Sequence, residues 1–419
     1  MRIGSRTGMF YGWRVAGAAF VLGIFGWGLG FYGPPVFLSV IREARGWSIA
    51  LISAAVTAHF LIGAVAGANL PALHRRFGAA GVTKAGAVAM AAGIIGWSLA
   101  VAPWQLFAAA VLSGMGWGAM SAAALNAIVS PWFVRARPAA LAMAYNGGSV
   151  GGIVFSPLWV AAVGALGFPM AATAIGVCMV LVLWALADLV FSRTPETMGL
   201  RPDGDAPGAP TAAVTSPAAR PLPGPLLWRD RGFLTLAAGM GLGLFAQIGL
   251  TAHLYSLLAP TLGAQPAGLA MVLVTVMAIA GRMLLGWLMP PGADRRLVAC
   301  CGYAAQCAGS IVFILAAGTD VPLLLLGVIL FGAGFGNATS LPPLIAQVEF
   351  VKDDLPRAVA LVVAVAQGGF AFAPAAFGLV RTFVPQSAGA APGDVPALFA
   401  AAALVQGFAI GAFLAGRRR

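Results

Sequence analysis

The run Ala270-Met-Val-Leu-Val-Thr-Val-Met-Ala-Ile-Ala-Gly-Arg-Met-Leu-Leu-Gly-Trp-Leu-Met289 contains a single charged residue, Arg282. About 20 consecutive apolar residues span the hydrocarbon core of a bilayer as one helix. A guanidinium at that depth costs about 2.5 to 3.5 kcal/mol on insertion scales, so such a residue normally faces a wet cavity. The run therefore predicts a membrane-spanning helix in which Arg282 holds an anion.

A second interpretation of Arg282 is that it pairs with a carboxylate or with backbone carbonyls and locks two helices together. Of the 12 Asp and Glu residues, Asp188 lies inside a predicted span, near one of its ends, and Asp394 is the first residue of the last predicted span. A bidentate guanidinium matches the geometry of a carboxylate. We favour anion binding, and the structural interpretation stays open.

The composition of the whole chain is that of an integral membrane protein. Of its 419 residues, 60% are hydrophobic and 9% are charged, and the mean hydropathy is +0.93. The net charge of +12 does not indicate a nucleic-acid partner, because the basic residues form no patch with interleaved aromatics. The four cysteines lie in apolar runs and predict no disulfide frame. The sequence shows no metal-ligand cluster and no nucleophile with an ordered base. It therefore does not favour an enzyme, and we expect no metal and no cofactor.

Apolar runs divided by Gly, Pro and charged residues predict an all-α polytopic membrane protein with twelve transmembrane helices in two pseudo-symmetric six-helix bundles. The first bundle, residues 1–191, contains predicted spans at 13–37, 49–73, 82–101, 104–128, 139–163 and 169–191. The second bundle, residues 232–419, contains predicted spans at 232–258, 265–289, 297–316, 321–346, 357–381 and 394–416. Residues 192–231 between the bundles are rich in Pro, Gly, Ala and charge and predict a mobile linker.

Lys and Arg are distributed unevenly between the two sides of this arrangement. Of the 24 basic residues, 20 lie in the termini, the linker and the loops on the same side, whereas Arg42, Arg45 and Arg381 lie on the opposite side. The side richer in Lys and Arg normally faces the cytoplasm. The sequence therefore predicts that both termini and the linker are cytoplasmic, in a protein of the inner (plasma) membrane surrounded by the lipid bilayer.

An internal repeat relates the two bundles. The segment Ala142-Met-Ala-Tyr-Asn-Gly-Gly148 matches Val363-Ala-Val-Ala-Gln-Gly-Gly369, which puts Asn146 and Gln367 at equivalent positions. A duplicated scaffold in which one half carries a charge predicts a binding site between the halves. The amides of Asn146 and Gln367 are candidates to hydrogen-bond the substrate, although such amides also bridge helices.

Glycine-rich segments mark two further features. Tyr32 lies in Gly28-Leu-Gly-Phe-Tyr-Gly-Pro-Pro35, where Gly and Pro loosen the first span, and interrupted helices at membrane depth often line a cavity. Tyr32 is therefore a candidate substrate contact, with an aromatic-packed kink as the alternative. The runs Gly114-Met-Gly-Trp-Gly118 and Gly332-Ala-Gly-Phe-Gly336 lie inside spans and predict close helix packing.

Two histidines lie at membrane depth. His59 in the second span is predicted to be a hydrogen-bonded structural group. His253 in the seventh span is a candidate to donate to a carboxylate on Arg282 and to carry a proton with it, with a structural role as the alternative.

The layout of six plus six spans, the basic loops after the second and eighth spans and the long linker resemble the Major Facilitator Superfamily. The segment Trp132-Phe-Val-Arg-Ala-Arg-Pro-Ala-Ala-Leu-Ala-Met-Ala-Tyr-Asn-Gly-Gly-Ser-Val-Gly151 is similar to the signature of the monocarboxylate transporter family and its bacterial relatives, which include the oxalate and formate exchangers. Tyr11-Gly-Trp-Arg-Val15 resembles the bacterial form of another signature of that family. Asp294-Arg-Arg296 resembles part of the superfamily's gating loop.

This resemblance implies an alternating-access transporter of a small organic anion, above all a monocarboxylate such as lactate or pyruvate, coupled to protons. In the family the arginine of the eighth span binds the carboxylate, and Arg282 occupies the matching place. The exchangers carry a second basic residue where this chain has Gln367, so one fixed charge implies one carboxylate. Gating roles are implied for Arg135, Arg137, Asp294 and Arg295. Anion exchange, transport of another metabolite or a drug, and a membrane sensor that moves no ligand stay open as alternatives.

Overall fold

The computed structural model describes residues 10–205, 221–290, 292–383 and 393–417 of the chain. Within these residues the regular structure is helical and contains no strand. Twelve helical segments are long and apolar enough to cross a membrane. The predicted all-α membrane fold with twelve spans is therefore confirmed.

The first six spans are followed by the two short linker turns. These elements are α1 (Tyr11–Gly30), α2 (Gly33–Arg45), α3 (Ile49–Ala68), α4 (Leu70–Leu99), α5 (Pro103–Met120), α6 (Ala122–Val129), η1 (Ser130–Trp132), α7 (Arg137–Leu166), α8 (Phe168–Leu186), η2 (Ala187–Phe191), η3 (Pro202–Gly204) and η4 (Gly224–Arg229). The last six spans are formed by α9 (Arg231–Leu262), α10 (Ala264–Leu288), α11 (Arg295–Leu315), α12 (Val321–Phe335), α13 (Asn337–Glu349), α14 (Leu355–Phe370), α15 (Ala373–Phe383) and α16 (Pro396–Ala415).

Helices extend beyond the predicted spans where polar residues continue them. The first span was predicted to end at residue 37, but α2 continues to Arg45 and ends there because Gly46 adopts a left-handed conformation with φ of 66°. The third was predicted to begin at residue 82, but α4 begins at Leu70 and includes the basic stretch before it, with a kink at Gly78. Hydropathy marks the apolar part of a helix and not its polar ends, so these boundaries could not be read from it.

Four spans are interrupted near their middle. The first is broken between α1 and α2, the fourth between α5 and α6, the tenth between α12 and α13, and the eleventh between α14 and α15. The predicted loosening of the first span is confirmed, since Phe31 and Tyr32 separate α1 from α2. The breaks in the fourth and tenth spans occupy corresponding places in the two halves: one follows the run 114–118 within three residues, and the other lies at Gly336, the last residue of the run 332–336.

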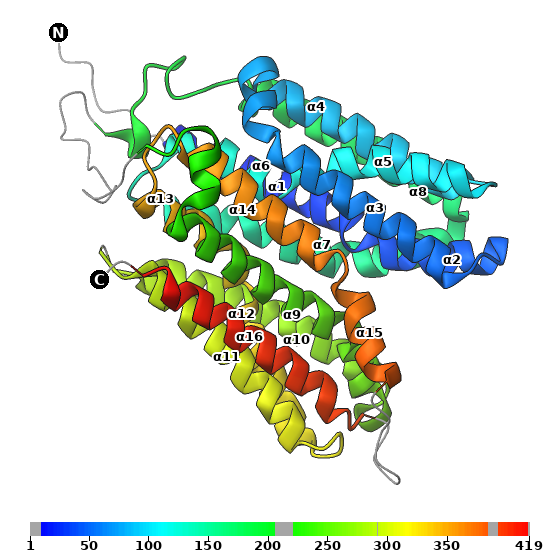
Figure 1. The fold of residues 1–419 in the computed structure, drawn as a ribbon. Helices are drawn as coiled ribbons and strands as arrows, with labels where there is room; N and C mark the ends of the chain where they lie inside the picture. The colour runs from blue at the N-terminus through cyan, green and yellow to red at the C-terminus, as the bar shows by residue number, and fades with distance from the viewer. Residues whose placement is uncertain (1–9, 206–220, 291, 384–392, 418–419) are drawn as a thin grey trace.

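The two halves of the chain pack against each other through a limited set of helices (Figure 1). The helix α14 lies against α3 and α6, and α10 and α13 lie against α7. At the other end of the molecule, α15 packs on α9 and α16 of its own half, and α2 packs on α3 and α7 of its own half. Figure 1 shows the halves converging toward the end that carries both termini and diverging toward the end that carries α2 and α15. We call these the linker end and the far end.

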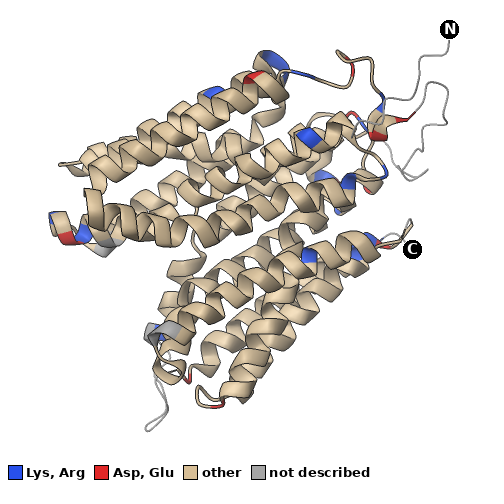
Figure 2. Ribbon diagram, turned by 180° about the vertical axis from the view of Figure 1, so that it is seen from behind, with Lys and Arg blue, Asp and Glu red and all other residues tan. Residues whose placement is uncertain are grey.

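Basic residues gather at the linker end. Figure 2 shows most Lys and Arg residues near the termini and the linker, with a smaller group at the far end. The segregation that the sequence predicts is therefore present along the long axis of the molecule.

Part of the predicted linker is held on both halves. The carboxylate of Asp203 accepts hydrogen bonds from the backbone N–H groups of Val134, Arg135 and Ala136 at 3.1, 2.8 and 3.1 Å. On the other half, Asp354 accepts from the backbone N–H of Leu222 at 2.7 Å. These linker segments are docked, whereas residues 206–220, on which the prediction of mobility also falls, lie outside the described residues.

Candidate functional site

A cavity lies between the two halves, which is the position that the internal repeat predicts for a binding site. Its wall is formed by residues of α1, α5, α6 and α7 from the first half and of α9, α10, α12, α13 and α14 from the second. The cavity volume is about 70 Å³. Among the described residues that line it, Arg282 is the only charged one.

Two hydrogen bonds fix the guanidinium of Arg282 through Nε and Nη1, and Nη2 stays available for a ligand. The side chain is only 5% exposed. Its Nε donates to the carbonyl of Gly336 at 2.8 Å, and its Nη1 donates to Oδ1 of Asn146 at 2.6 Å. Within the described part of the chain, Nη2 has no hydrogen-bond partner and no carboxylate forms an ion pair with the guanidinium. Arg282 therefore bonds a carbonyl, as the structural interpretation expects, and still presents unused donors to the cavity.

The approach of Arg282 to Gly336 depends on the absence of a side chain there. Gly336 lies at the junction of α12 and α13, and a Cβ at this position would meet the carbonyl of Ala278 and the Cβ of Arg282. In the other half, a Cβ at Gly118 would meet the Cβ of Ala66 on α3. The glycine-rich runs thus form close helix crossings, as their composition predicts.

The repeat-related amides each bond to the opposite half of the protein. Asn146 on α7 accepts from Arg282 on α10, and Nε2 of Gln367 on α14 donates to the carbonyl of Phe60 on α3 at 2.9 Å. Gln367 also lines the cavity, whereas Asn146 lies behind Arg282 and is not part of the wall. Both amides bridge helices, which was the alternative to direct substrate contact.

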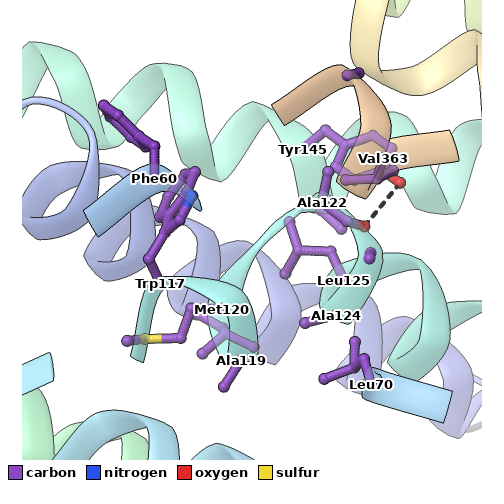
Figure 3. Packing of buried hydrophobic residues seen from close by; sticks show 14 of the residues in the cluster. Phe60, Leu70, Trp117, Ala119, Met120, Ala122, Ala124, Leu125, Tyr145 and Val363 are labelled. Atoms are coloured by element: carbon purple, nitrogen blue, oxygen red, sulfur yellow. Dashed lines mark hydrogen bonds between the residues drawn. The ribbon is translucent and has the colours of Figure 1, made fainter. Parts of the chain in front are cut away.

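Two tyrosines belong to the cavity wall. Tyr32, from the break between α1 and α2, was a sequence candidate and does line the cavity. Tyr145 was not predicted; its hydroxyl donates to the carbonyl of Ala122 at 3.2 Å, as the dashed line in Figure 3 shows. That bond fixes the start of α6 just after the break in the fourth span.

Aromatic rings from both halves meet beside the cavity. The ring of Phe370, at the end of α14, lies 6.4 Å from that of Phe31 and 5.8 Å from that of Phe60, measured between centroids. Phe31 and Phe370 both line the cavity. These contacts join the broken middles of the first and eleventh spans through apolar surfaces alone.

His253 does not line the cavity. One ring nitrogen, Nε2, lies 3.1 Å from the carbonyl of Pro374, and the other, Nδ1, lies 3.4 Å from Nη1 of Arg381. A carbonyl can only accept and a guanidinium can only donate, so the ring donates through Nε2 and accepts through Nδ1. In this conformation both nitrogens of His253 are engaged toward α15 and neither contacts Arg282.

His59 is a buried, hydrogen-bonded group, 1% exposed. Its Nδ1 lies 2.8 Å from Oγ of Ser113, and its Nε2 lies 2.9 Å from the carbonyl of Gly30, which ends α1. The indole N–H of Trp97 donates to the same hydroxyl at 3.1 Å. These bonds tie α3, α4 and α5 to the break in the first span.

The candidate gating residues of the first half lie at the linker end. Arg135 forms a two-point ion pair with Asp205 of the linker, with distances of 2.5 and 3.0 Å. Hydrogen bonding to Asp205 and its charge raise the pKa of Arg135. Arg137 donates to the carbonyls of Phe133 and Ser130, both at 2.9 Å. The two arginines therefore hold the linker and the loop before α7, away from the cavity.

The candidate gating residues of the second half also lie at the linker end. Asp294 caps α11 and pairs with Arg417 at 2.7 Å; partial burial acts to raise the pKa of this carboxyl, but the hydrogen bonds from Arg417 and Leu297 hold it below its usual value. Arg295 donates to the carbonyl of Leu344 and to Oε1 of Gln347.

Some residues of these sites were missed from the sequence. Gln347 bridges the halves at the linker end by donating from Nε2 to the carbonyl of Val134 at 3.2 Å. Trp117 and Gln247 line the cavity from opposite halves. The signal for Gln247 was an isolated amide in an apolar span, and Trp117 was hidden inside a glycine-rich run that we had assigned to packing alone.

The comparisons with known proteins agree with this architecture. The chain matches the family model of the Major Facilitator Superfamily over residues 15–374. No curated protein sequence matches it. A crystal structure of the human organic anion transporter MFSD10 (TETRAN) is similar, with a TM-score of 0.64 and 15% sequence identity over 97% of this chain and 99% of that chain. At this identity the likeness shows the fold alone. Because the family model covers most of the chain, this protein belongs to the Major Facilitator Superfamily and has the fold of a secondary transporter, not of an enzyme.

Proposed function

We propose that this protein transports a small organic monocarboxylate by alternating access and that Arg282 binds the carboxylate. The observation that carries the proposal is that Nη2 of a guanidinium only 5% exposed has no partner among the described residues. Gly336 and Asn146 hold the other two nitrogens, so the remaining donors are fixed in place before a ligand arrives. A carboxylate can accept from Nη2 and from the second N–H of Nη1, which is the bidentate pairing that guanidinium favours.

The charge and size of the cavity favour an anion with one negative charge and few atoms. Among the described wall residues, Arg282 supplies the only full positive charge, so a second carboxylate would be buried without a partner at a cost of several kcal/mol. Sites for drug-sized ligands measure roughly 300–1,000 Å³. The volume of about 70 Å³ is far below that range and favours an acid with a short carbon chain.

The contacts between the halves support alternating access. Hydrogen bonds cross from one half to the other at Arg282, Gln367 and Gln347, which lie between the middle of the membrane span and the linker end. Nearer the middle, rings meet through apolar contact that can separate without leaving polar groups unpaired. An anion on Nη2 would add a charged bond to Arg282, which already contacts both halves. The organic anion transporter with the similar fold is consistent with this class of cargo.

Proton coupling stays a prediction of the sequence, and the geometry gives His253 no direct part in it. To reach an anion on Arg282, the imidazole would have to leave both Pro374 and Arg381. A proton gradient imposed on reconstituted vesicles distinguishes symport from exchange, since exchange needs an anion on the opposite side.

Uptake into liposomes tests the proposed function. Purified protein is reconstituted and supplied with labelled lactate, with pyruvate, oxalate or lactamide as competitors. Lactamide keeps the shape of lactate and removes its charge, and oxalate adds a second carboxylate. We expect protein-dependent uptake that pyruvate inhibits and that lactamide and oxalate do not. Inhibition by lactamide as strong as that by pyruvate would contradict an anion site, and binding without uptake would indicate a sensor.

A further inference from the structure

Among the described residues of the cavity wall, two fully buried polar side-chain atoms have no hydrogen-bond partner. They are Nε1 of Trp117 on α5 and Oε1 of Gln247 on α9, and both side chains are 2% exposed. Two other polar side chains of the wall are paired within the protein: Tyr145 donates to a carbonyl of α6, and Gln367 donates to a carbonyl of α3. The unpaired donor and the unpaired acceptor belong to opposite halves of the protein, and both residues line the same cavity.

An unpaired buried donor or acceptor costs about 1–3 kcal/mol. Trp117 cannot remove that cost by turning, because its ring is enclosed by backbone. A Cβ at Gly30 would meet the benzene edge of the indole, and a Cβ at Gly63 would meet both the Cδ1 of Trp117 and Nε2 of Gln367. The ring of Trp27 packs on it with centroids 5.0 Å apart. The pyrrole edge, which carries Nε1, is thereby held beside the cavity-lining amide of Gln367.

We propose that Trp117 and Gln247 form an uncharged subsite that recognises a hydroxyl group on the carried acid; this inference rests on the proposed function of Arg282. A hydroxyl is the small group that satisfies both atoms at once. Its oxygen accepts from the indole N–H of Trp117, and its hydrogen is donated to Oε1 of Gln247. A keto oxygen satisfies only Trp117, and a methylene satisfies neither. The cavity therefore takes a short hydroxy monocarboxylate, with the carboxylate on Arg282 and the hydroxyl on this pair.

A site built to hydrogen-bond a hydroxyl discriminates strongly against an analogue that lacks it, because its own polar groups are then left unpaired. Lactate, pyruvate and propionate have the same number of carbon atoms and differ only at the second one. We expect the wild-type protein to bind lactate at least about tenfold more tightly than propionate, with pyruvate between them.

The test is the ratio of dissociation constants for these three acids in the wild type, Trp117→Phe and Gln247→Met. Each variant should bring the lactate-to-propionate ratio to within about threefold, and thermal unfolding measured in parallel shows whether the variant is folded. Trp104→Phe on the same helix, at a side chain 70% exposed, and Gln306→Met, at a fully buried glutamine outside the cavity, are matched controls that should keep the wild-type ratio.

The outcomes separate this inference from the function on which it rests. Equal binding of the three acids by the wild type, tighter binding of pyruvate than of lactate, or an unchanged ratio in both variants would overturn the hydroxyl subsite and leave the anion site on Arg282 standing. Failure of all three acids to bind would overturn the anion site and the subsite with it.

Discussion

At the scale of single residues, Arg282 joins the two halves of the protein and still offers a donor to a ligand. Its Nε is bonded to Gly336 in its own half and its Nη1 to Asn146 in the other. A guanidinium in this position costs several kcal/mol unless its donors are used. Neutral acceptors use two of its nitrogens and leave its charge unbalanced. An arriving carboxylate balances that charge, so binding stabilises a contact between the halves.

The first prediction concerns His253, whose ring lies outside the cavity and is bonded to Pro374 and Arg381. His253→Gln should change the dissociation constant for a monocarboxylate by less than about twofold. Isothermal titration of the purified variant measures it. A loss of tenfold or more would place the imidazole in the anion site, as the sequence alone had suggested.

The sequence predicted Arg282 because a lone charge in an apolar span is costly wherever the helix packs. It could not identify the partners of Arg282, since these depend on how closely α10 approaches α7 and the junction of α12 and α13. His253 shows the same limit. Its depth in the seventh span was predictable, but the direction of its ring is set by packing against α15. For Trp117, an indole N–H becomes informative only when the structure shows that it is unpaired.

At the scale of helices, the glycine at the break of the tenth span sets the distance between α10 and the α12–α13 junction. A Cβ at Gly336 would meet the backbone carbonyl of Ala278 closely enough that one helix must shift. Both α12 and α13 are anchored on α11, so the shift moves the carbonyl that orients Arg282.

The second prediction follows from this crossing. Gly336→Ala should destabilise the protein by about 1–3 kcal/mol, the usual cost of overpacking, and weaken carboxylate binding. Thermal unfolding in detergent and titration with lactate measure the two effects. Gly407→Ala on α16, where an added Cβ meets no atom within 4 Å, is the matched control and should leave both unchanged. Equal behaviour of the two variants would contradict the tight crossing.

The third prediction concerns the docked part of the linker. Asp203 accepts three backbone hydrogen bonds from residues 134–136 and adopts a left-handed conformation with φ of 59° to do so. Asp203→Ala should release this segment and speed amide hydrogen exchange at 134–136. Glu196→Ala, at an exposed acid of the same segment, should leave exchange there unchanged. Unaltered exchange in Asp203→Ala would show that the contact does not hold the loop.

The number of membrane-spanning helices was predictable because the length of each apolar run decides whether it can cross a bilayer as a helix. The ends of α2 and α4 were not, because polar residues extend these helices beyond their apolar parts. Linker docking was not predictable either. It depends on the carboxylate of Asp203 accepting from three backbone N–H groups some 70 residues earlier in the chain. The composition of this segment, rich in Pro and Gly, indicates only a connector.

At the scale of the whole molecule, the two halves touch at the linker end and diverge at the far end (Figure 1). The cavity lies where these regions meet. Three hydrogen bonds between the halves, at Arg282, Gln367 and Gln347, would have to break for the linker end to open.

The fourth prediction concerns orientation and rests on the segregation of basic residues to the linker end (Figure 2). A topology reporter inserted in the linker, between residues 206 and 220, should give the signal of a cytoplasmic location. The same reporter placed after Arg45, between the first two spans, should report the opposite side. A periplasmic signal from the linker would reverse the proposed orientation.

The central claim, that Arg282 binds a carboxylate, is tested most directly by the dissociation constant of lactate for purified wild type, Arg282→Gln, Arg282→Lys and Arg381→Gln. Charge-assisted hydrogen bonds contribute about 1.5–3 kcal/mol each, so Arg282→Gln should weaken binding on the order of 100-fold. Arg282→Lys should recover little of it, because an ammonium cannot form the two-point pairing. The Arg381→Gln variant lacks an arginine that lies outside the cavity, so its dissociation constant for lactate should be close to that of the wild type. Wild-type affinity in a folded Arg282→Gln protein would contradict the account.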